Sequence, residues 1–199
     1  MQMDTKTLST TIVFAAVTVA LNPAISGIAI PAPYAPYLLY QIWEIPIVAA
    51  FVLINRKSAV SIAVLNAVVL VAFFPGALPS GPIYNLIAIL SMLLGIFIIQ
   101  KSFKTKNPTN SIQNESEYTK TKFVTLSTVL GIILRVVVMT VVNYVVLRYP
   151  YPLGYQLEEL AIVTVFLPPT GLFNATLALY TIPVGLFVAK AINKNLKLK

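Results

Sequence analysis

The sequence predicts an all-α integral membrane protein, a single bundle of six transmembrane helices. Of its 199 residues, 58% are hydrophobic and 10% are charged, whereas soluble domains carry about 25% charged residues. Several apolar stretches approach the ~20 residues that cross ~30 Å of hydrocarbon. Too little sequence remains between them for a separate soluble domain, so we expect one membrane domain over residues 1–199.

Six apolar stretches define the predicted helices. They are Leu8 to Ile30, Tyr37 to Asn55, Ser58 to Phe74, Ile83 to Lys101, Phe123 to Arg148 and Gly171 to Ile192. The second is the weakest, because its apolar core after Pro46 is short and reaches spanning length only if the helix begins before that proline. Residues 102–122 are polar and without apolar periodicity, which is typical of a flexible linker.

Basic residues gather in alternate loops, and this predicts the orientation. Twelve of the 14 lie on one side of the predicted bundle: Lys6, Arg56, Lys57, Lys101, Lys104, Lys106, Lys120, Lys122, Lys190, Lys194, Lys197 and Lys199. The positive-inside rule therefore places both termini in the cytoplasm. A cleavable signal peptide is the alternative at the N-terminus, but its removal would carry the basic loops to the wrong side. No basic patch is interleaved with stacking aromatics, so the charge does not predict nucleic-acid binding.

Tyrosine is concentrated at the predicted outer ends of the helices. Eight of the ten tyrosines lie there: Tyr34, Tyr37, Tyr40, Tyr84, Tyr144, Tyr149, Tyr151 and Tyr155. A membrane-anchoring aromatic belt is one explanation, although belts occur at both interfaces. The one-sided excess favours a lidded site for a flat, partly apolar ligand.

Four asparagines fall in the outer halves of predicted helices: Asn22, Asn85, Asn143 and Asn174. An unpaired amide in hydrocarbon costs several kcal/mol, so we expect these side chains to turn inward. They either form a polar ring around a ligand or act as ordinary interhelical struts.

Arg135 lies near the middle of the predicted fifth helix. At 1.5 Å per residue it is roughly 18 Å from Phe123, so it must be buried and paired. We expect no acidic partner at matching depth, which leaves carbonyls, amides or a ligand; support beneath a cavity and direct ligand contact are both open. Met139 and Asn143 follow on the same face. This helix is therefore predicted to carry the polar side of an externally open pocket.

The first helix carries small residues at four-residue spacing, Ala16, Ala20 and Ala24. Such a seam lets another helix approach closely. It serves either packing within the bundle or docking of a partner.

The chain has no histidine and no cysteine, which removes thiol nucleophiles and the commonest metal ligand. None of its glycines forms a GxxxxGK[ST] phosphate loop. The adjacent Glu158 and Glu159 are expected on a solvated loop rather than in a catalytic pair. We predict no enzyme, cofactor or metal site, but a binding subunit driven by other proteins.

Three segments together resemble the substrate-binding S-components of energy-coupling factor (ECF) vitamin transporters, most closely the riboflavin-specific type. They are WEIPIVAAFVLINRKSAV (43–60), GPIYNLIAILSMLLGIFIIQK (81–101) and RVVVMTVVNYVVLRYPY (135–151). Ala16 and Ala20 match the AxxxA motif with which this family docks on its coupling subunit. Two features depart from the family: the start of the sixth helix lacks a lysine, and Asn55-Arg56-Lys57 replaces the usual Gly-Pro turn.

The resemblance implies a multi-pass subunit of the plasma membrane that binds a vitamin from outside and works with a transmembrane coupling subunit and two ATPases. It places a ligand against Glu44, Asn85, Asn143, Tyr144 and Asn174, with Arg135 beneath and Tyr40 and Trp43 in the lid. Another vitamin or small heterocycle is an alternative ligand. A non-transporting assembly or scaffold subunit is the alternative function.

Overall fold

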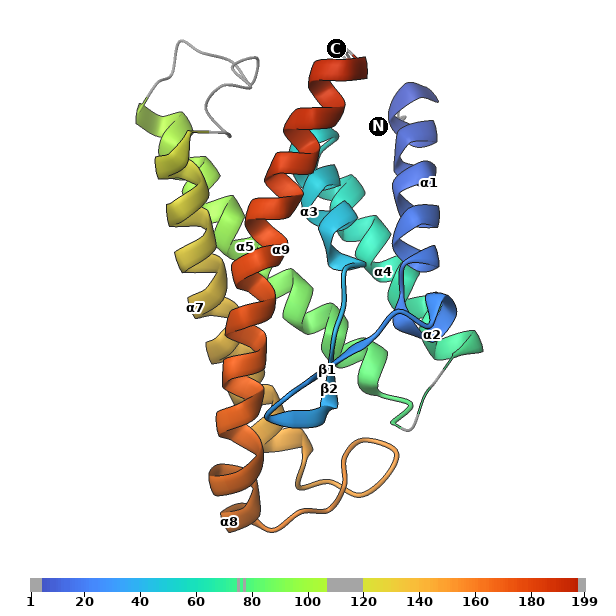
Figure 1. Cartoon of the computed structure of the whole chain (residues 1–199), viewed down its shortest axis with the longest axis vertical. Helices are drawn as coiled ribbons and strands as arrows, with labels where there is room; N and C mark the ends of the chain where they lie inside the picture. Colours follow the sequence, from blue (N-terminus) through green and yellow to red (C-terminus); the bar gives the residue numbers. More distant parts are fainter. Residues whose placement is uncertain (1–4, 75, 77, 107–119, 197–199) are drawn as a thin grey trace.

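Helices dominate the computed structural model, which describes residues 5–74, 76, 78–106 and 120–196. Four helical segments are long and apolar enough to cross a membrane; they contain α4 (Arg56–Phe73), α5 (Gly81–Lys106), α7 (Thr121–Val146) and α9 (Leu167–Leu196). Two shorter apolar helices are α1 (Thr5–Ala20) and α3 (Glu44–Leu53). Helix α1 begins and α9 ends at the same end of the molecule, here called the terminal end (Figure 1). The opposite end is called the hairpin end.

The first helix is shorter than predicted, because it ends at Ala20 and not at Ile30. Asn22 precedes a proline, a position that disfavours helical backbone, and its φ and ψ of −64° and 135° are extended. The Asn22 side chain caps the four-residue helix α2 (Pro23–Ser26), since its Oδ1 accepts a hydrogen bond from the Ala24 N–H at 3.1 Å. Asn22 therefore serves a helix end and does not join the other amides.

The all-α prediction misses a β-hairpin. Strands β1 (Ile30–Ala32) and β2 (Ala35–Tyr40) pair antiparallel, with Ile30 opposite Tyr40. Prolines recur through this segment, and a residue without an N–H is tolerated on an edge strand but not inside a helix. The predicted helix Tyr37 to Asn55 is consequently wrong over its first seven residues, and its helical part is α3.

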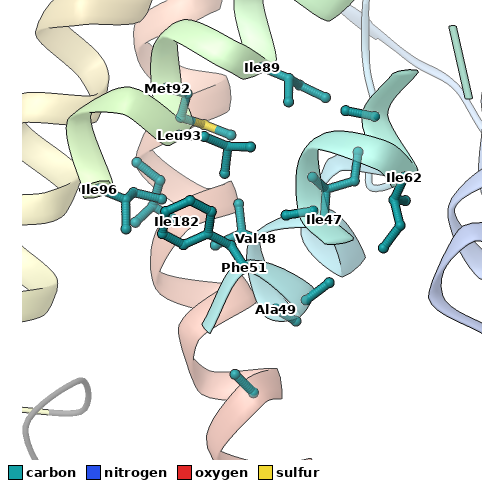
Figure 2. Close-up of a cluster of buried hydrophobic side chains, with 14 of the residues drawn as sticks. Ile47, Val48, Ala49, Phe51, Ile62, Ile89, Met92, Leu93, Ile96 and Ile182 are labelled. Atoms are coloured by element: carbon teal, nitrogen blue, oxygen red, sulfur yellow. The ribbon is translucent and has the colours of Figure 1, made fainter. Parts of the chain in front are cut away.

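Helix α3 is a central core element. It begins two residues before Pro46, so the proline lies in the first turn, where its missing N–H costs nothing. Residues Ile47 to Phe51 are all at most 4% exposed, and they pack against side chains from α4, α5 and α9 (Figure 2). A helix that is apolar on every side is stable when fully enclosed.

The other helices lie close to their predicted positions. The bounds of α4 and α7 agree within about two residues, and α5 continues to Lys106, so the predicted linker 102–122 is too long; its residues 107–119 lie outside the described residues. The last helix starts earlier than Gly171. Helix α8 (Glu159–Ala161) and the π-helix η1 (Ile162–Phe166) lead without a break into α9. The apolar segment 161–169 forms the first turns of this helix.

Helices α5 and α7 make a very close backbone approach at Gly95 and Gly131. A Cβ added to Gly95 would lie 2.7 Å from the Gly131 Cα atom. Real Cβ atoms do not approach backbone so closely, so this crossing depends on glycine.

We expect Gly95→Ala to lower stability by about 1–3 kcal/mol, since the helices must separate to admit the methyl group. The thermal unfolding midpoint of the purified protein in detergent measures this. Gly171→Ala is the matched control, because its Cβ would meet nothing within 4 Å. Equal midpoints for the two variants would contradict the glycine-dependent crossing.

Candidate ligand-binding cavity

A cavity of about 300 Å³ lies toward the hairpin end, between the hairpin, α5, α7 and the η1–α9 helix. Its polar side chains are Asn85, Arg135, Asn143, Thr170 and Asn174. Its aromatic side chains are Tyr37, Tyr84, Tyr155, Phe166 and Phe173. Apolar walls with a few polar groups are typical of small-molecule sites, which hold roughly 300–1,000 Å³.

Three amides line the cavity, one from each long helix around it. The Asn143 Nδ2 donates to the Met139 carbonyl at 2.7 Å, and the Asn174 Nδ2 donates to the Thr170 carbonyl at 2.9 Å. Because a carbonyl only accepts hydrogen bonds, each amide nitrogen must face its own helix. The Asn85 side chain has no hydrogen-bond partner among the described residues, so its amide group remains for a ligand.

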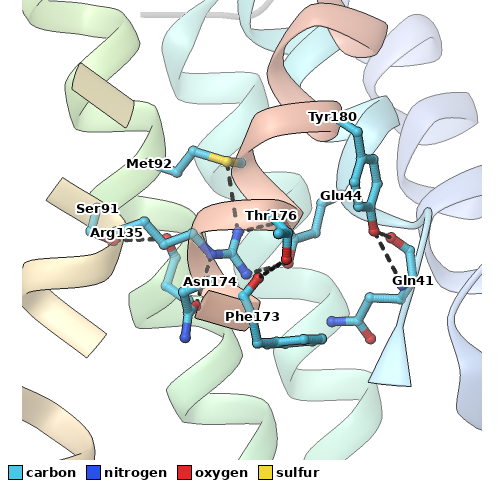
Figure 3. Close-up of polar contacts among 10 residues, drawn as sticks. Gln41, Glu44, Ser91, Met92, Arg135, Phe173, Asn174, Thr176 and Tyr180 are labelled. Carbon is cyan, nitrogen blue, oxygen red and sulfur yellow. Dashed lines mark hydrogen bonds and ion pairs between the residues drawn. The ribbon is translucent and has the colours of Figure 1, made fainter. Parts of the chain in front are cut away.

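Arg135 forms a buried ion pair with Glu44, shown in Figure 3. Its Nη1 and Nη2 donate to the two carboxylate oxygens at 2.5 and 2.8 Å, and Nε donates to the Asn174 Oδ1 at 3.0 Å. The expectation that no acidic residue reaches this depth is therefore wrong. The hairpin sets the start of α3 partway along the bundle (Figure 1), whereas a continuous helix from Tyr37 would place Glu44 nearer the hairpin end.

The hairpin is attached to η1 and α9 by aromatic and polar contacts. The Tyr37 and Phe166 rings lie 5.9 Å apart, and Tyr40 lies 5.1 Å from Phe173. The Tyr40 hydroxyl also bonds to the Thr176 hydroxyl at 2.8 Å. The hairpin thus supplies an aromatic wall.

The loop after α7 closes another side of the cavity. Ser80 donates to the Pro152 carbonyl at 2.8 Å, and Tyr84 donates to the Leu153 carbonyl at 2.6 Å. These bonds hold the loop against the start of α5. Tyr155, from the same loop, lines the cavity.

Four of the eight predicted ligand residues line the cavity, namely Asn85, Arg135, Asn143 and Asn174. The other four lie outside its lining. Glu44 pairs with Arg135, and Tyr40 attaches the hairpin to α9. Trp43 is 1% exposed in the apolar core. The Tyr144 hydroxyl donates to Glu159 at 2.6 Å, and the Arg148 guanidinium stacks on its ring.

Sequence reasoning overlooked the contribution of the last helix to the aromatic wall. Phe166, Thr170, Phe173 and Asn174 all line the cavity. They follow a spacing of i, i+4, i+7 and i+8, which marks one helical face. The sequence carries this spacing, but the predicted helix begins at Gly171. That boundary separates Phe166 and Thr170 from Phe173 and Asn174.

The predicted seam on α1 faces outward. Ala16 and Ala20 are exposed and line an apolar groove of about 570 Å³ between α1 and α4. The Thr11 hydroxyl donates to the Ser58 hydroxyl at 3.0 Å. This bond joins α1 and α4 beside the groove. The seam is therefore accessible to an external helix.

Among the described residues, no group of three or more carboxylates could hold a metal ion. No protein-family model matches the chain, and no curated protein matches it.

A solved structure described as the S component of a bacterial ECF transporter has a similar fold. The TM-score is 0.73 at 21% sequence identity, over 96% of this chain and 98% of that chain. The fold and the four apolar helices define a multi-pass helical membrane protein. Its fold is similar to that of this S component.

Replacement of Glu44 by leucine is expected to destabilise the protein by about 3–5 kcal/mol, because it leaves Arg135 buried without its counter-ion. The double variant Glu44→Leu/Arg135→Met should lose much less than the sum of the single changes. Thermal unfolding in detergent measures this cycle. The exposed pair Arg148 and Glu159 is the control, and Glu159→Leu should change the midpoint little. Additive losses at Glu44 and Arg135 would contradict the pairing.

Proposed function

We propose that this chain is the membrane-embedded substrate-binding subunit of an ECF-type importer, which captures riboflavin or a related vitamin from outside. The observation that carries the proposal is the amide- and aromatic-lined cavity in an S-component fold. The subunit is not an enzyme and works with a transmembrane coupling subunit and two ATPases. These partners use ATP to drive uptake.

In the proposed orientation the terminal end faces the cytoplasm and the hairpin end faces outward across the plasma membrane. Lysines and arginines at the ends of α1, α4, α5, α7 and α9 support this orientation under the positive-inside rule. Six helical segments lie in the membrane. Helices α1 and α3 have 16 and 10 residues and are short for a full crossing. We propose that α2 lengthens the first of these two segments and that the hairpin lengthens the second.

We propose that Asn85, Asn143 and Asn174 bind the polar edge of the ligand above Arg135. The aromatic residues would contact its flat faces. Tyr40, Trp43, Glu44 and Tyr144 would support the cavity from behind or beside its wall. The start of α9 contributes Thr170, Phe173 and Asn174 and no lysine to the cavity. A different vitamin is therefore the main alternative to riboflavin.

Riboflavin titration of purified protein should quench its tryptophan and tyrosine fluorescence. Asn143→Leu and Asn174→Leu should each weaken binding about 10- to 100-fold, the equivalent of a lost hydrogen bond and an unsatisfied ligand group. Asn193→Leu, the same change near the far end of α9, is the control. Unchanged affinity in the two cavity variants would remove the amide site. A folded protein that binds no vitamin would favour the scaffold alternative.

We also propose that Ala16 and Ala20 form the docking seam for the coupling subunit. Ala16→Trp should abolish co-purification with that subunit and cellular vitamin uptake, since the indole blocks close helix approach. Vitamin binding by the isolated chain should not change. Val141→Trp places the same bulk on an exposed position of α7 and should leave assembly intact. If the Ala16→Trp variant still assembles with the coupling subunit, Ala16 and Ala20 do not form the docking seam.

A further inference from the structure

We infer that Glu44 sets the charge that the cavity accepts. It neutralises Arg135 from behind the wall, so the cavity selects an uncharged ligand over an anionic one of the same shape. This inference rests on the proposed ligand-binding function. It gives Glu44 a positioning role that acts through Arg135.

The charges around the cavity support this role. Among the described residues that line it, Arg135 is the only one with a formal charge. Glu44 is absent from the lining and has 0% exposure. A ligand therefore meets Arg135 as the charged residue of this lining, while the Glu44 carboxylate pairs with it from outside the lining.

The hydrogen bonds leave the arginine little capacity to bind an anion. A guanidinium has five N–H donors. Two of them face the Glu44 carboxylate, one faces the Asn174 Oδ1, and one lies 3.6 Å from the Met92 sulfur. The planar fork that recognises a carboxylate is already occupied by Glu44. One N–H remains for a ligand.

Loss of the carboxylate would change the preference of the cavity without moving its walls. Glutamine has nearly the same shape as glutamate but no charge, so Glu44→Gln leaves a buried cation uncompensated. Such a charge is costly in an apolar bundle. An anion that enters the cavity would then replace the missing counter-ion.

Benzamide and benzoate test this charge selectivity, because they share a shape and differ in charge. Their binding to wild type and Glu44→Gln is measured in chloride-free buffer as the rise of the unfolding midpoint with probe concentration. We expect benzoate to bind Glu44→Gln at least about tenfold more tightly than wild type, with benzamide little changed. A general structural defect would affect both probes alike. Equal benzoate responses of the two proteins would overturn the inference.

The double variant Glu44→Gln/Arg135→Gln is the matched control and should lose the benzoate response, since it carries neither charge. If Glu44→Gln cannot be obtained folded, Arg135→Gln tests whether the Arg135–Glu44 pair sets the charge preference of the cavity, because it removes the cation instead of the carboxylate. It leaves Glu44 unpaired, so the benzamidine cation should stabilise it more than benzamide does. No such preference would also overturn the inference. Neither probe is a vitamin, so a failure of the proposed vitamin is seen separately in the riboflavin titration.

Discussion

An arginine in the middle of an apolar bundle must be paired, and the cavity of this protein is organised around the carboxylate that pairs it. Arg135 is 1% exposed and Glu44 is 0% exposed, so neither charge can turn to solvent. The low dielectric strengthens their attraction and makes separation costly. The same guanidinium bonds to Asn174. The ion pair therefore links α3 to α7, and the hydrogen bond to Asn174 links α7 to α9 and orients an amide of the cavity.

The β-hairpin is the element that delivers Glu44 to this depth. Gln41, just beyond β2, is bound through both backbone groups to the Tyr180 hydroxyl, at 3.3 and 2.6 Å. Glu44 follows three residues later as the first residue of α3. Tyr37 and Leu38 in β2 line the cavity. The segment 37–44 thus supplies part of the aromatic wall of the cavity and also the carboxylate that neutralises Arg135.

Hydropathy alone predicts the four long helices, because each needs about 20 apolar residues and little else. The four-residue spacing of Arg135, Met139 and Asn143 predicts that they share a helical face, and all three line the cavity. The partner of Arg135 could not be predicted in this way. It depends on how deeply the hairpin enters the bundle, which is a property of tertiary packing. The Asn22-Pro23 step was a readable local signal, since residues before proline avoid helical backbone.

The two proposed functional regions occupy different parts of the bundle. The cavity lies among α5, α7, α9 and the hairpin, whereas the exposed seam lies on α1, which packs on α3 and α4. Helix α3 connects them, since it carries Glu44 at one end and most of its residues are buried in the core. Its buried apolar contacts and the Gly95–Gly131 crossing resist internal sliding, because close-packed cores deform at high cost. Under the proposed function, the bundle would therefore move as one body against its coupling subunit.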